Sequence, residues 1–138
     1  MRVFNAAKVS PWRTAVVATV LTGAMAGSAF AAVSDLTMDS TAGLSPGHLH
    51  ATLTGTVTCD AGTAVFLSGQ IVQSGVASGY GGSSIACNGK AQEYNVDVST
   101  GGSGVFKTGR ANADMSTMEC TEVACTTKYV DAIIRLTR

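Results

Sequence analysis

A strict alternation of apolar and polar residues between Leu49 and Cys59 is the feature that most restricts how this chain can fold. Side chains that alternate with a period of two point to opposite faces of an extended strand, so one set faces a core and the other faces solvent. The pattern predicts a half-buried antiparallel strand. Its expected inner face carries Leu49, Ala51, Leu53, Gly55, Val57 and Cys59, and its outer face carries His50, Thr52, Thr54, Thr56 and Thr58.

The same period recurs along the rest of the chain after residue 60. We predict strands within residues 63–73, 83–87, 92–98, 111–120 and 126–136, and a ragged first strand near residues 36–41. No stretch after residue 31 shows a convincing helical period of 3.6. The apolar residues expected to share strand faces are Val65, Leu67 and Ile71, then Tyr94, Val96 and Val98 together with Gln92, then Ala111, Ala113 and Met115, and finally Val130, Ala132, Ile134 and Leu136.

Turn-forming residues separate these strands. Asp60-Ala61-Gly62 and Asn88-Gly89 are typical of tight turns, and Asn-Gly is the strongest hairpin signal in the chain. The glycine-rich segments 74–82 and 100–104 are predicted to be loops. Seven short strands with turn signals every 8–12 residues are typical of an immunoglobulin-like sandwich. We therefore expect an all-β fold, an immunoglobulin-like seven-stranded antiparallel sandwich with two disulfides, in a single domain over residues 32–138.

Residues 1–31 have the pattern of a secretory signal peptide. Arg2, Lys8 and Arg13 precede an apolar run over residues 14–26, and Ala29-Phe30-Ala31 fits a cleavage site, with Ala32 as the new amino terminus. The alternative is an uncleaved membrane anchor, but the run is shorter than the roughly 18–20 residues that span a bilayer. We predict a secreted, extracytoplasmic protein.

The neutral overall charge conceals an acidic domain. The whole chain has nine basic and nine acidic residues, but three of the basic ones lie in the predicted signal peptide, which leaves six against nine and a net charge of −3. A domain with this balance lacks the basic stripe of a nucleic-acid-binding protein. It also has no electrostatic attraction to anionic membrane surfaces.

Four cysteines follow the predicted leader, at Cys59, Cys87, Cys120 and Cys125. An even number in a small exported domain predicts two disulfides. A zinc site is the alternative, but no C-x2-C pair supports it. We favour the pairs 120–125, which closes a short hairpin, and 59–87. If the strands follow the immunoglobulin topology, all four cysteines lie at one pole, and the pairs 59–120 and 87–125 also become sterically possible.

Few residues suggest catalysis or metal binding. His48-Leu49-His50 could present two imidazoles to a metal ion, with Asp39 or Asp60 adding oxygens, but a polar strand start explains the pattern equally well. Gly81-Gly82-Ser83-Ser84-Ile85 lacks the closing glycine of a nucleophile elbow. The loop Gly79-Tyr80-Gly81-Gly82 lacks the Gly-Lys-Ser/Thr of a phosphate loop. We predict no catalytic residues, no metal site and no cofactor.

The hairpin from Glu119 to Thr127, with its C-x4-C spacing, resembles the last disulfide hairpin of the neocarzinostatin-type apoproteins. The resemblance implies a secreted seven-stranded sandwich with two disulfides that carries a small chromophore. The wide Cys59–Cys87 gap departs from that family's close first pair. Residues 50–138 also resemble small secreted actinobacterial proteins that share the Gly55–Cys59 strand, the Cys87-Asn88-Gly89 turn and the Lys107-Thr108-Gly109 turn. That second resemblance implies fold and export rather than an activity.

These observations favour a secreted binding or structural module over an enzyme. Its partner would be an extracellular protein, a glycan or a small molecule. The alternative function is a small-molecule carrier or an inhibitor of a secreted enzyme, by analogy with the apoproteins. The residues expected to contact a partner are the loop residues Asp60, Asn88, Lys90 and Glu122 at the cysteine pole, together with Tyr80.

Overall fold

The structure, a computed structural model, describes residues 33–120, 122 and 124–138. The predicted signal peptide and its cleavage site lie outside these residues. The described part of the chain is all-β and contains no helix, as predicted, so none of its segments is a helix able to cross a membrane. Its eight strands are β1 (Val33–Leu36), β2 (Thr41–Leu44), β3 (His50–Cys59), β4 (Ala64–Gln73), β5 (Ala77–Ala86), β6 (Ala91–Ser99), β7 (Gly109–Cys120) and β8 (Cys125–Thr137).

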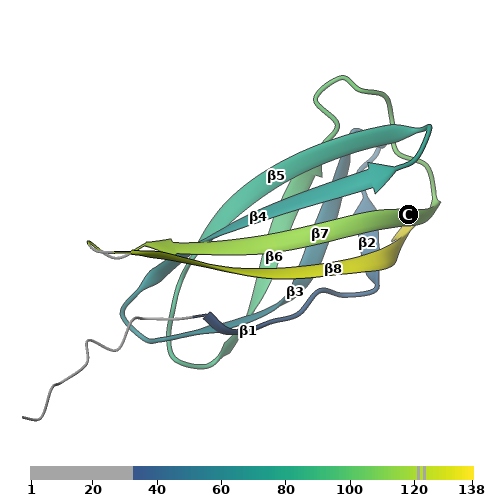
Figure 1. Cartoon of the computed structure of the whole chain (residues 1–138). Coiled ribbons are helices and arrows are strands. Elements are labelled where there is room, and N and C mark those ends of the chain that lie inside the picture. The colour runs from purple at the N-terminus through teal and green to yellow at the C-terminus, as the bar shows by residue number, and fades with distance from the viewer. Residues whose placement is uncertain (1–32, 121, 123) are drawn as a thin grey trace, which may run out of the picture.

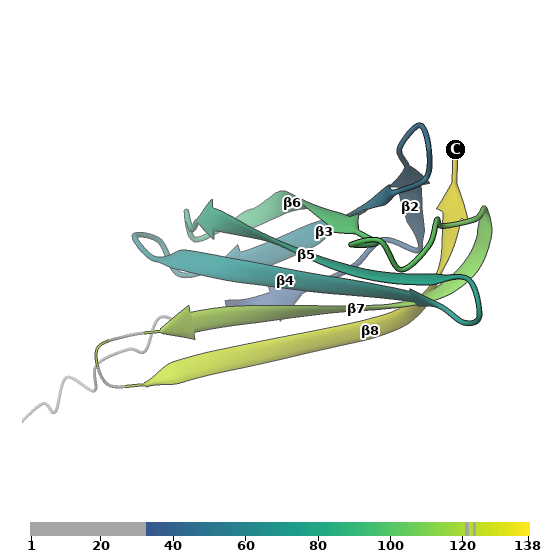
Figure 2. The same cartoon turned by 90° about the horizontal axis from the view of Figure 1, so that it is seen from above.

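The strands form one continuous sheet that closes on itself as a barrel (Figures 1 and 2). The order is β1-β3-β2-β8-β7-β4-β5-β6, and β6 pairs with β3 to complete the circle. Because β1 and β2 occupy successive halves of the same edge of β3, the barrel has seven strand positions. The predicted ragged first strand is therefore two short strands. The sequence predicts a sandwich of two separate sheets, whereas the structure has one closed sheet.

β2, one of the first described strands, meets β8, the last one, in the barrel wall. β2 pairs in parallel with β8, so that Thr41 lies opposite Arg135, and the Arg135 amide donates a hydrogen bond to the Ser40 carbonyl. On the other side, β5 and β6 share a single bridge between Tyr80 and Ser99. The barrel is therefore well paired at β2–β8 and thinly paired at β5–β6.

Alternating side chains fill the interior, as the sequence period predicts. The residues expected to face the core on β3, β4, β6 and β7 are buried, except that Leu49 precedes β3 and is 47% exposed and that Gln92 is half-buried. Phe106 enters the core from the loop between β6 and β7 and is fully buried. The largest fully buried side chains are those of Phe106, Leu53, Leu67, Ile71, Met115, Ile134 and Leu136.

The prediction of a loop over residues 74–82 is right for the turn at residues 74–76 and wrong for residues 77–82, because β5 begins at Ala77 and pairs with β4 along its whole length. The glycines of this segment let β5 approach β6 closely. A Cβ at Gly81 would collide with the carbonyl oxygen of Asp97, and a Cβ at Gly79 would collide with that of Ser99. Glycine here permits a close approach of two backbones rather than a turn.

Candidate functional site

Both predicted disulfides are present, Cys59–Cys87 and Cys120–Cys125, and the alternative pairing is excluded. All four cysteines lie at the same pole, where β3, β5 and β7 end and β8 begins (Figure 1). Backbone hydrogen bonds join the two turns around the first disulfide, from Gly62 to the Cys87 carbonyl (3.1 Å) and from Gly89 to the Cys59 carbonyl (3.1 Å). The Cys59–Cys87 disulfide and these hydrogen bonds therefore cross-link the two turns at this pole.

The structure brings together three of the five predicted contact residues. Asp60, Asn88 and Lys90 lie on the two turns joined by the Cys59–Cys87 disulfide. Asn88 has a structural role there, because its Oδ1 accepts a hydrogen bond from the Lys90 amide (2.9 Å). Glu122 lies on the separate β7–β8 hairpin and is exposed. Tyr80 lies in the middle of β5, opposite Gln70, and not in a loop.

The two histidines do not converge on a metal site. His48 adopts a left-handed backbone conformation with φ of 59°, so the segment before β3 is not extended. The Nδ1 of His48 donates a hydrogen bond to the Phe106 carbonyl (3.0 Å), and the Phe106 amide donates one to the His48 carbonyl (2.9 Å). His48 therefore helps to hold the loop that inserts Phe106 into the core.

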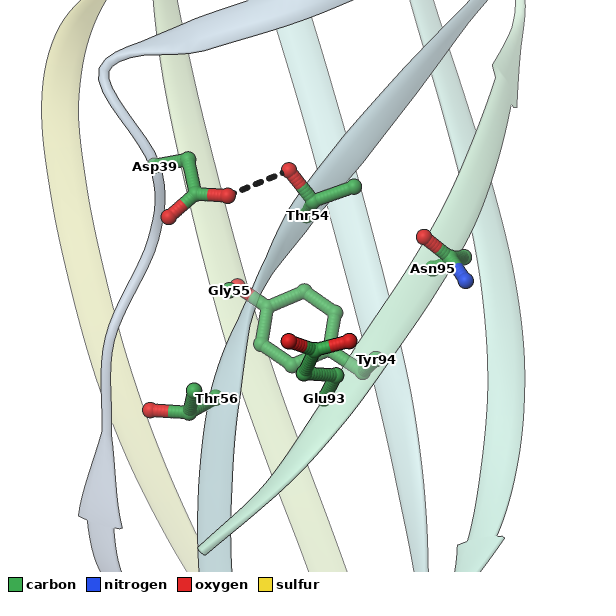
Figure 3. Close-up of a pocket in the computed structure, with 7 residues that line it drawn as sticks. All are labelled: Asp39, Thr54, Gly55, Thr56, Glu93, Tyr94 and Asn95. Carbon is green, nitrogen blue, oxygen red and sulfur yellow. Dashed lines mark hydrogen bonds between the residues drawn. The ribbon is translucent and has the colours of Figure 1, made fainter.

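A polar hollow of about 280 Å³ lies on the outside of β3 and β6, lined by seven residues (Figure 3). Two of the lining residues carry carboxylates. Asp39 comes from the segment between β1 and β2, and Glu93 comes from β6. The hydroxyl of Thr54 donates a hydrogen bond of 2.6 Å to Asp39, which holds that carboxylate in place. The remaining lining residues are Gly55, Thr56, Tyr94 and Asn95.

Tyr94 lies beneath this hollow with its ring in the core. It faces Gly55 across the β3–β6 pair, and its hydroxyl donates a hydrogen bond of 2.7 Å to the Thr37 carbonyl. Burial, and after it the negative charge of Asp39, raises the pKa of Tyr94 to about 12. A phenol with so high a pKa stays protonated at neutral pH, so its hydroxyl serves the wall of the barrel and is no proton acceptor for chemistry in the hollow.

A second surface is formed by the outward side of β5, β4, β7 and β8, which we call the outer face. The aromatic rings Tyr80 and Tyr129 on it are 77% and 73% exposed. Phe66 lies directly opposite Met118, and both are about half exposed. Exposed apolar side chains gathered on one side of a small protein are typical of a binding surface. The large apolar residues of the outer face are Phe66, Val72, Tyr80, Met118, Tyr129 and Ile133.

Like charges face each other across β7 and β8 on this outer face. Asp114 lies opposite Asp131, and four residues away along the strands Arg110 lies opposite Arg135. Directly opposed like charges destabilise an antiparallel pair. Burial, and after it the charge of Asp131, raises the pKa of the Asp114 carboxyl. The barrel therefore retains two repulsive pairs where opposite charges would have stabilised it.

The outer face was missed at the level of sequence, apart from Tyr80. A usable signal existed, because the Cys120–Cys125 hairpin defines the pairing of β7 with β8. Counting back equally from both cysteines places Asp114 opposite Asp131 and Arg110 opposite Arg135. The other half of the face could be predicted only from the pairing of β4 with β7. That pairing joins residues distant in sequence, and no local turn indicates it.

Comparisons with protein-family models, with curated proteins and with solved structures found nothing that matches the chain.

Proposed function

We propose that this chain is an exported, disulfide-stabilised module that binds a protein partner through its outer face. The observation that carries the proposal is the combination of exposed apolar side chains with two repulsive charge pairs on one sheet surface. Tyr, Phe and Met are enriched at protein interfaces. A partner with suitably placed charges would relieve the repulsion at both pairs. The electrostatic free energy that destabilises the free protein would then favour the complex.

Export is the second part of the proposal. The pattern of residues 1–31 supports it, and so do the two disulfides, because such bonds form and persist in oxidising compartments. A disulfide-cross-linked pole also suits a module that must remain folded outside the cell. The single bridge between β5 and β6 supports a relation to immunoglobulin-like sandwiches, in which the strands form two separate sheets.

The alternative function as a small-molecule carrier has less support. The hollow at Asp39 is lined by carboxylates, hydroxyls and an amide, whereas carriers of apolar molecules use apolar cavities. The interior of the described barrel is filled by core side chains such as Phe106 and Leu67. We therefore place the binding surface on the outside of the sheet.

The test is capture from the medium in which the protein is naturally secreted. The exported chain is immobilised beside two variants, one with Asp114→Arg and Asp131→Arg on the outer face and one with Lys90→Glu and Glu122→Lys at the cysteine pole. We expect a protein that is retained by the wild type and by the pole variant, is lost from the face variant and elutes as salt is raised. Equal capture by the face variant, or capture of glycan alone, would overturn the proposal.

A further inference from the structure

The charged pairs of the outer face are arranged symmetrically about a row that consists of two apolar side chains with an amide between them. Val72, Asn112 and Ile133 lie side by side on β4, β7 and β8. Ile133 is 58% exposed and Val72 is 36% exposed. Asp114 lies two residues from this row on one side and Arg110 lies two residues from it on the other. At about 3.3 Å per residue, each charged pair is about 7 Å from the row.

Such a pattern is complementary to itself. A half-turn about an axis that runs across the strands at the level of Ile133 exchanges the two ends of β7 and β8. The same rotation carries the aspartate pair of one molecule over the arginine pair of another, and the reverse. We propose that a second copy of this chain docks face to face on the outer face in this two-fold arrangement. The inference rests on the proposed function and names its partner.

The geometry of sheet packing accommodates this dimer. Stacked sheets lie about 10 Å apart with their side chains between them, a distance that Asp and Arg side chains span together. In a two-fold interface the same patch is used by both molecules. Ile133 and Val72 would meet their own counterparts at the centre, and Asp114 and Asp131 would lie opposite Arg110 and Arg135 of the second copy. The centre of the interface then holds two aliphatic side chains and the Asn112 amide from each copy, and four ion pairs surround it.

Net charge favours a second copy over a strongly charged partner. The two aspartates and two arginines give this part of the face no net charge, so neither a strongly basic nor a strongly acidic protein matches both pairs. Two copies that each carry a net charge of −3 repel weakly at physiological salt, where charges more than about 8 Å apart are screened. Phe66 and Met118 lie beyond the aspartate pair, toward the cysteine pole, and stay outside the contact.

Sedimentation equilibrium of the exported chain tests the inference with two charge-swapped variants. One carries Asp114→Arg and Asp131→Arg, and the other carries Arg110→Asp and Arg135→Asp. We expect the wild type to form a dimer that weakens as salt is raised. Each variant alone should dissociate at least tenfold more readily, because its face repels a copy of itself. The equimolar mixture should dimerise again, which also shows that both variants are folded. Glu122→Lys, on the exposed hairpin, is the matched control and should dimerise like the wild type.

Two results would overturn the inference. One is a wild type that stays monomeric at every concentration, and the other is a charge-swapped variant that dimerises as well as the wild type. A monomeric wild type whose outer face still captures a different protein would leave the proposed function standing. Failure of both the dimer and the face-dependent capture would remove both.

Discussion

Tyr94 and Gly55 show how one side chain depends on the absence of another. The tyrosine lies opposite the glycine on the inner side of the β3–β6 pair. A Cβ at position 55 would lie 2.7 Å from the Tyr94 hydroxyl oxygen, closer than side chains pack. Glycine therefore leaves the space in which the hydroxyl reaches the Thr37 carbonyl. This contact ties the segment after β1 to the barrel wall.

Titration of Tyr94 should be visible in the pH dependence of stability. Its pKa is raised to about 12, so the folded protein keeps this proton between pH 10 and 12 while the unfolded chain, with a tyrosine pKa of about 10, loses it. The unfolded state then binds fewer protons, and the free energy of unfolding should fall through this window. Urea unfolding at several pH values measures the effect. Tyr94→Phe should flatten this fall, and an unchanged pH dependence in the variant would contradict the assignment.

Glu119 is the one described residue whose buried side-chain oxygens lack a hydrogen-bond partner. It is 3% exposed on the inner side of β7, and neither carboxylate oxygen is bonded to any described residue. Burying a carboxyl group without a partner costs free energy. We expect Glu119→Met, which is similar in size and apolar, to raise the free energy of unfolding by about 1–3 kcal/mol. Denaturant unfolding at pH 7 measures this.

Glu93 offers the matched control for that measurement. Its carboxylate is exposed on the outside of β6, so Glu93→Gln should change stability by less than about 0.5 kcal/mol. A loss of stability in Glu119→Met would mean that the buried carboxyl group has a stabilising partner in solution.

At the scale of the strand, the glycines of β5 decide how closely the barrel closes. Gly81→Ala places a methyl group against the Asp97 carbonyl of β6, so the two backbones must separate. We expect a loss of about 1–3 kcal/mol, the usual cost of overpacking. Gly43→Ala on β2 is the matched control, because a Cβ there meets nothing within 4 Å. Equal free energies of unfolding of the two variants in urea would show that β5 and β6 can move apart without a loss of stability.

Local patterns were sufficient for most strands and insufficient for their pairing. Alternation located β3, β4, β6, β7 and β8 because each buries one face, which the residue order reports directly. It predicted only the second half of β5, as residues 83–87, and missed the first half, whose glycines are required by the approach of a distant strand. The pairing across the outer face escaped for the same reason, since Phe66 meets Met118 from 52 positions away. Only for the hairpin closed by Cys120–Cys125 could the strand pairing be derived from the sequence, because the two cysteines define it.

At the scale of the whole molecule, the two disulfides contribute unequally. Cys59–Cys87 closes a segment with a sequence separation of 28, and Cys120–Cys125 closes one of 5. The chain-entropy model assigns about 3.6 kcal/mol to the longer loop and about 2 kcal/mol to the shorter. We expect Cys59→Ala with Cys87→Ala to lower the free energy of unfolding more than Cys120→Ala with Cys125→Ala. Thermal and urea unfolding of the two double variants decide the order, and the reverse order would contradict the model.

The parallel pairing of β2 with β8 also sets when the barrel can close. Thr41 pairs with Arg135 of β8, and the Arg135 amide donates a hydrogen bond to the Ser40 carbonyl. Lys128 likewise donates a hydrogen bond to the Ser34 carbonyl. Contacts between such distant residues form slowly. The barrel can close only when β8 is present, because β2 has β3 on one side and β8 on the other. We therefore expect the pairing of β2 with β8 to be among the last steps in the folding of this barrel.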